Sequence, residues 1–189
     1  RLLNLVNPYT KLALKDDPAV VGVTFVNEQY FSWSEKDCNA MNPEWQKWMR
    51  RRTGENREFP ALNKQLALGT DPVGVAMALF MGEKECEMIS YFTKVVRDTG
   101  FKGLVSNDIC FSIANVPAMS QMQTIAWHPY FAHPNYVNGK QIVSGDSALV
   151  AASISAYRFF DKPLFINEYN HVMWNQFRHE GTIRYATLA

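Results

Sequence analysis

Two glutamates lie just after apolar runs near opposite ends of the 189-residue chain. Glu28 comes two positions after residues 19–26 (AVVGVTFV), and Glu168 comes two positions after residues 163–166 (PLFI). If both runs are strands of one parallel sheet, their carboxyl ends meet at one edge and bring the carboxylates together. Two neighbouring carboxylates can act as an acid and a base, because burial and mutual charge move their pKa values apart. Glycoside hydrolysis needs such a pair: one carboxylic acid protonates the leaving oxygen, and one carboxylate attacks the anomeric carbon.

Other polar residues also follow apolar runs. His128 and Tyr130 come directly after residues 122–127 (MQTIAW), and Asn107 and Asp108 follow residues 103–106. Function in parallel sheets sits at the carboxyl ends of strands, so these positions favour one shared site. For either glutamate taken alone, a helix cap or an ion pair with an arginine is an alternative interpretation.

The elements that must position these residues alternate along the chain. We expect strands at residues 19–26, 103–106, 122–127 and 163–166, and helices at residues 43–52, 83–98, 147–160 and 176–188. Residues 53–82 contain six glycine and proline breakers, and we interpret them as a long insertion with one or two helical turns. The strand–helix alternation predicts a single α/β domain with a parallel sheet.

The strand-end motifs together resemble the retaining (β/α)8 glycosidases of cellulase and mannanase type. The resemblance lies in Asn27-Glu28 after VVGVTFV, His128-Pro129-Tyr130 after MQTIAW, and Glu168 after KPLFIN. It extends over nearly the whole chain, is weakest over residues 53–82, and corresponds to strands 4 to 7 of that barrel. It implies a TIM-barrel type of fold, here a partial barrel of about four βα units spanning residues 1–189.

The resemblance also implies roles for individual residues. Glu28 matches the general acid/base, Glu168 the nucleophile, and Asn27 the residue that hydrogen-bonds the sugar 2-hydroxyl. His128 matches the residue that holds the acid/base, and Tyr130 the donor to the nucleophile. A tyrosine hydroxyl that donates to a carboxylate favours its ionised form. The implied reaction is hydrolysis of a β-linked polysaccharide or oligosaccharide with retention of configuration.

Two tryptophans are candidates for stacking on a sugar. Trp33 and Trp174 lie in loops that follow the first and last expected strands, where they would face the cleft. Packing within the core is the alternative for both.

We expect no cofactor and no metal. His128, His133, His171 and His179 could form a metal site with Glu168, but none has the helical His-x-x-x-His spacing that puts two ligands on one face.

Composition excludes several classes of function. A formal net charge of +1 argues against a nucleic-acid or anionic-membrane binder that works by bulk charge. No stretch approaches the roughly 18 apolar residues of a membrane span. The three cysteines are an odd number and imply no disulfide framework. The residues themselves do not indicate a compartment, whereas the family resemblance favours a secreted or periplasmic protein.

Four strands also leave open edges. Strands 1 to 3 and strand 8 of the family have no counterpart in the chain, and exposed strand edges invite pairing with another chain. We therefore expect a homodimer or a companion chain that supplies the missing strands. Two alternatives to an enzyme remain open: a carbohydrate-binding fragment without catalysis, and a structural half-barrel.

Overall fold

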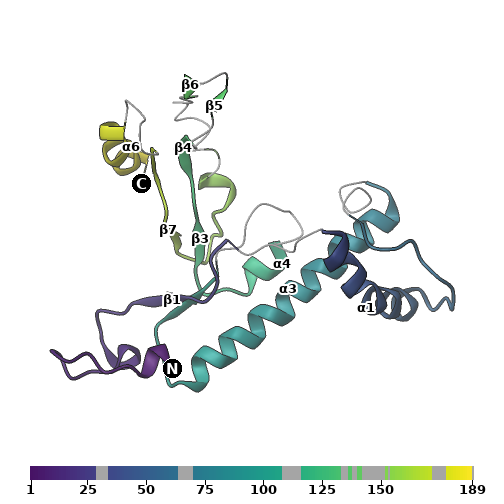
Figure 1. Cartoon of the computed structure of the whole chain (residues 1–189), viewed down its shortest axis with the longest axis horizontal. Helices are drawn as coiled ribbons and strands as arrows, with labels where there is room; N and C mark the ends of the chain where they lie inside the picture. Colours follow the sequence, from purple (N-terminus) through teal and green to yellow (C-terminus); the bar gives the residue numbers. More distant parts are fainter. Residues whose placement is uncertain are drawn as a thin grey trace.

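The protein is a mixed α/β chain whose strands are short and mainly parallel (Figure 1). The computed structural model describes residues 1–28, 34–63, 70–107, 116–132, 136–137, 140–141, 152, 154–171 and 178–188. The helices are α1 (Glu35–Thr53), α3 (Pro72–Asp98), α4 (Val116–Ser120) and α6 (Gly181–Leu188), with short 3-10 turns η1 (Leu2–Asn4), η2 (Leu14–Asp16) and η4 (Arg178–Glu180). The strands are β1 (Gly22–Thr24), β2 (Leu104–Ser106), β3 (Ile125–Trp127), β4 (Tyr130–Ala132), β5 (Tyr136–Val137), β6 (Lys140–Gln141), β7 (Leu164–Ile166) and β8 (Asn170–His171).

Six of the described strands form three parallel pairs. β1 pairs with β2, β3 pairs with β7, and β4 pairs with β8, each in parallel. Side chains link the first pair to the second, since Ser106 Oγ donates to the carbonyl oxygen of Thr124 at 3.2 Å and Val105 N donates to Gln123 Oε1 at 3.1 Å. The expected α/β class with parallel strands is therefore confirmed, but the described strands form separate two-stranded sheets rather than one continuous sheet, and β5 and β6 pair in antiparallel fashion.

One face of these strands is buried against helices. Val105 packs with Val96 of α3, and Ile125 packs with Ile89 of α3 and with Met119 of α4. Because successive strand residues point to opposite faces, these positions alternate with residues of the other face. The long helix α3 thus contributes to the packing of both the β1–β2 pair and the β3–β7 pair.

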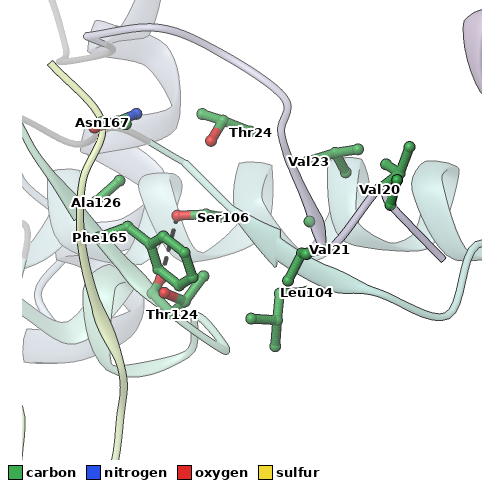
Figure 2. A pocket seen from close by; sticks show the side chains of 12 residues that line it. Val20, Val21, Val23, Thr24, Leu104, Ser106, Thr124, Ala126, Phe165 and Asn167 are labelled. Atoms are coloured by element: carbon green, nitrogen blue, oxygen red, sulfur yellow. Dashed lines mark hydrogen bonds between the residues drawn. The ribbon is translucent and has the colours of Figure 1, made fainter.

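The opposite face of the strands borders an open cavity. Side chains from all four strands β1, β2, β3 and β7 line this cavity of about 480 Å³ (Figure 2). They include Thr24, Leu104, Ala126 and Phe165, and Phe165 is 44% exposed. We call this surface the inner face. Its apolar side chains are partly open to solvent.

The first helix begins earlier than expected. The sequence predicts a helix over residues 43–52, but α1 starts at Glu35 and its cap is Ser34, whose hydroxyl accepts a hydrogen bond from Asp37 N at 3.2 Å. Pro43 lies inside the helix rather than in its first turn. The prediction placed the helix start at the proline and missed the stronger Ser34 cap.

The interpretation of residues 53–82 as a long insertion is wrong over residues 72–82. These residues form the first part of α3, where Asp71 accepts hydrogen bonds from Val73 N at 2.9 Å and Gly74 N at 3.0 Å. Pro72 occupies the first turn, where no intrahelical N–H is needed. Burial of Phe80 against the Trp45 and Trp48 rings of α1 outweighs the low helix propensity of the glycines.

The remaining elements are close to expectation but shorter. The strands predicted at residues 19–26, 103–106, 122–127 and 163–166 shorten to β1, β2, β3 and β7. The helix predicted at residues 83–98 forms the second part of α3, and the one at 176–188 is η4 followed by α6. Of residues 147–160, the described positions 152 and 154–156 are helical. Within the described part of the chain, no helix is long and apolar enough to cross a membrane.

Asp71→Ala should destabilise the protein by about 1 kcal/mol, because two N–H groups at the start of α3 lose their acceptor. Chemical denaturation followed by tryptophan fluorescence measures the change in the free energy of unfolding. Asp98→Ala is the matched control at the other end of α3: it removes only an exposed ion pair with Lys94 and should change stability by less than about 0.5 kcal/mol. Equal effects of the two substitutions would contradict the capping role.

Candidate active site

The candidate site lies where one parallel strand pair gives way to the next. The β3–β7 pair ends with Trp127 opposite Ile166, and the β4–β8 pair begins with Tyr130 opposite Asn170. Residues 128–129 therefore lie opposite residues 167–169, so one side carries an extra residue. We call these five residues the ladder gap. Such a bulge re-aims side chains that regular alternation would send to the other face.

Sequence explains why the ladder is interrupted here. Pro129 has no N–H to donate to a neighbouring strand. Asn167 and Glu168 are consecutive, yet Asn167 lines the cavity at the inner face while Glu168 contacts Tyr130 and His128. Because of the extra residue after β7, the Glu168 side chain lies at the same edge as those of His128 and Tyr130.

Glu168 is held by the Tyr130 hydroxyl. Tyr130 Oη donates to Glu168 Oε2 at 2.6 Å, a short distance typical of a hydrogen bond to a charged acceptor. This hydrogen bond raises the pKa of Tyr130 to about 12, with smaller contributions from burial and from the charges of Glu168 and Glu28. The phenol therefore remains a donor over the whole neutral range.

His128 connects the two glutamates. Its side chain is only 1% exposed, and its Nδ1 lies 3.0 Å from Glu28 Oε1 and 3.7 Å from Glu168 Oε1. A carboxylate oxygen, like the carbonyl oxygen of a carboxylic acid, accepts hydrogen bonds, so we assign the proton of the imidazole to Nδ1. The buried ring fixes the position of Glu28, whose own side chain is 47% exposed.

Glu28 also has an unusual backbone conformation. Its φ of 44° lies in the left-handed region that few residues other than glycine adopt. This turn lies four residues beyond the end of β1 at Thr24, and the Glu28 carboxylate contacts His128, a residue 100 positions further along the chain. Strain of this kind is found at sites where the surrounding contacts hold a side chain in place.

Four of the predicted site residues therefore come together. One ligand atom each from Glu28, His128 and Glu168 lies within 4.8 Å of the others, and Tyr130 contacts Glu168. Asn27 is exposed and adjoins Glu28 at the end of β1. Trp33 and Trp174, the predicted sugar-stacking residues, lie outside the described residues.

Two kinds of chemistry suit this cluster. Two carboxylates at this separation can serve as a proton donor and a nucleophile. The same two carboxylates and the histidine could instead hold a metal ion, since their ligand atoms are close enough to share one. Of the other histidines in the sequence-based metal alternative, His179 is exposed beside Glu180 at 3.9 Å, and His133 is outside the described residues.

Comparisons with protein-family models, with curated proteins and with solved structures find no match to this chain. The sequence reasoning identified Glu28, His128, Tyr130 and Glu168, but it missed Tyr185 of α6. The Tyr185 hydroxyl donates to the carbonyl oxygen of Pro129 in the ladder gap. Tyr185 lies in a predicted helix with no motif around it, so no local signal pointed to it.

Tyr130→Phe should make the free energy of unfolding less dependent on pH in the alkaline range. The folded state holds the Tyr130 proton with a pKa of about 12, above the ordinary value of about 10, so wild-type stability falls as the pH rises through this window. The variant lacks this titration. Urea unfolding at about pH 9 and about pH 11.5 measures the difference, with Tyr91→Phe, an exposed tyrosine on α3, as the control. The same pH slope in Tyr130→Phe and the wild type would contradict the Tyr130–Glu168 bond.

Proposed function

We propose that this chain carries the active site of a retaining glycoside hydrolase acting on a β-linked polysaccharide or oligosaccharide. The observation that carries the proposal is the meeting of Glu28 and Glu168, with carboxylate oxygens within 4.8 Å of each other and His128 beside both. Retaining glycosidases place their two carboxyl groups about 5–5.5 Å apart, whereas inverting enzymes leave a wider space for water.

The different surroundings of the two carboxylates support their proposed roles. Glu168 accepts a 2.6 Å hydrogen bond from Tyr130, which suits a nucleophile that must stay ionised and fixed in position. Glu28 is the more exposed of the two and contacts His128. Exposure suits an acid/base, because this group must exchange protons with the leaving oxygen and then with water.

The proposed reaction proceeds in two displacements. In the first, a Glu168 oxygen attacks the anomeric carbon while the carboxylic acid of Glu28 protonates the leaving oxygen, and the glycosidic bond breaks. In the second, the Glu28 carboxylate takes a proton from water, and the resulting hydroxide oxygen displaces Glu168 from the anomeric carbon. The sugar leaves with its original configuration, and Glu28 regains its proton.

The substrate class and the barrel architecture are parts of the same proposal. The resemblance to cellulase- and mannanase-type enzymes supports a β-linked glycan, with Asn27 at the 2-hydroxyl and Trp33 and Trp174 as stacking platforms. It also supports a (β/α)8 arrangement of which β1, β2, β3 and β7 form one half. The parallel order of these strands and their shared inner cavity support this assignment.

The exposed inner face supports the proposal of a partner chain. It also leads to a second candidate function, that of a half-barrel without catalysis. Val21 is 63% exposed and Phe165 is 44% exposed on strand segments that line the cavity. In a closed barrel these side chains would be covered by further strands. We propose that a second copy or a companion chain covers them. If no such partner binds, the second candidate is a half-barrel that binds carbohydrate or serves as a structural unit without catalysis.

Glu168→Gln should lower turnover of every glycoside substrate by about 10⁴-fold or more, because the attacking oxygen is lost. Glu28→Ala should lower turnover of substrates with poor leaving groups by about 10²–10⁴-fold. With 4-nitrophenyl glycosides it should largely spare the first displacement, which then needs no proton, and slow the second displacement, which loses its base. Added azide should restore part of the Glu28→Ala rate and give a glycosyl azide of retained configuration.

Glu44→Gln is the matched control, because Glu44 lies on α1 in an exposed ion pair with Lys47. Its kinetics should equal those of the wild type. If azide rescued Glu168→Gln while Glu28→Ala remained inactive, Glu28 would be the nucleophile and Glu168 the acid/base. Loss of activity with a chelator, restored by added metal, would instead assign Glu28, His128 and Glu168 to a metal site.

The chain should also associate through the inner face. We expect light scattering of the purified chain to report a dimer, or a monomer that binds a fluorescent dye specific for exposed apolar surface. Phe165→Ser should reduce both the dimer fraction and the binding of the dye, since it removes the aromatic ring of this face. A monodisperse monomer that unfolds cooperatively and binds no dye would contradict the proposed partner.

A further inference from the structure

A buried tyrosine that the proposed reaction does not use packs against the ladder gap. Tyr185 lies on α6, is 7% exposed and packs against Ile154 and against Ile166 at the end of β7. Its ring lies 4.7 Å from the ring of Tyr169, between centroids, at an angle of 55°. Tyr185 therefore contacts the chain on both sides of Glu168.

The hydroxyl of Tyr185 reaches the other side of the gap. It donates a hydrogen bond to the carbonyl oxygen of Pro129, the residue between His128 and Tyr130. A buried carbonyl oxygen needs a hydrogen-bond donor, and the Tyr185 hydroxyl supplies one to Pro129 from α6. Burial, together with the nearby Tyr130 and Tyr169, raises the pKa of Tyr185, so the hydroxyl keeps the proton that it donates.

We propose that Tyr185 is a positioning residue, which fixes the gap so that His128 reaches Glu28 and Tyr130 reaches Glu168. This proposal rests on the proposed function of the site. Tyr185 acts through the Pro129 backbone, which lies between His128 and Tyr130, and through Ile166 and the Tyr169 ring, which lie on either side of Glu168 in the sequence.

The geometry explains why one hydroxyl can have this effect. His128 and Tyr130 are the immediate neighbours of Pro129, so a shift of the Pro129 carbonyl moves both of their side chains. Such a shift would lengthen two short contacts: 3.0 Å from His128 Nδ1 to Glu28 Oε1, and 2.6 Å from Tyr130 Oη to Glu168 Oε2. Misplacement of reacting groups by about 1 Å can reduce an enzymatic rate by about 10²-fold.

The test is Tyr185→Phe, which keeps the ring and its packing but removes the donor. We expect kcat to fall by about 10- to 100-fold while KM changes by less than about threefold, because the loss affects alignment rather than binding. Nitrogen NMR of the histidine side chains is a readout that does not need turnover. In the wild type the His128 Nδ1 proton should be observed and slow to exchange, and in the variant it should shift or exchange rapidly.

Tyr91→Phe is the matched control, since Tyr91 is 64% exposed on α3, and it should leave kcat and the His128 signal unchanged. If Tyr185→Phe lowers only the melting temperature and otherwise behaves like Tyr91→Phe, Tyr185 has a structural role and the proposal is overturned. If the wild type hydrolyses no glycoside, the proposed function fails separately, and the His128 signal still decides the role of Tyr185.

Discussion

The register between β3 and β7 is the constraint on which the candidate site depends. These strands are separated by almost forty residues, and their pairing places Trp127 beside Ile166. From that pair onward, two residues on one side lie opposite three on the other before pairing resumes at Tyr130 and Asn170. A shift of one residue would send Glu168 to the opposite face of the sheet, away from Tyr130.

Packing of β3 against the helices stabilises the register between β3 and β7. Ile125 is buried between α3 and α4, and the Trp127 ring stacks on Tyr157 with centroids 3.7 Å apart. Since these residues face the helices, the alternation of the strand directs Ala126 to the inner face. The apolar side of β3 thus sets the direction of the polar residues that follow it. His128 therefore follows a well-packed strand and is buried, whereas Glu28 lies at the exposed side of the site.

Much of this arrangement follows from local sequence patterns. The apolar runs before Glu28, His128 and Glu168 predicted the strands and their parallel order, because each run is short, apolar and followed by polar residues. The start of α3 was missed because Gly74 and Gly82 are poor helix formers, whose low propensity is offset by the Asp71 cap and by packing against α1. The β4–β8 pair and Tyr185 could not be predicted, since each depends on contacts between distant segments rather than on local periodicity.

The central claim is that Glu168 attacks the anomeric carbon, and covalent trapping tests it most directly. A 2-deoxy-2-fluoro β-glycoside with a dinitrophenolate leaving group slows both displacements, but the activated leaving group lets the first proceed, so the glycosyl–enzyme accumulates. Mass spectrometry of the intact chain followed by peptide mapping then locates the sugar. The account predicts one fluoroglycosyl group per chain, attached to Glu168. A sugar attached to Glu28, or no adduct in a preparation that hydrolyses the parent glycoside, would contradict it.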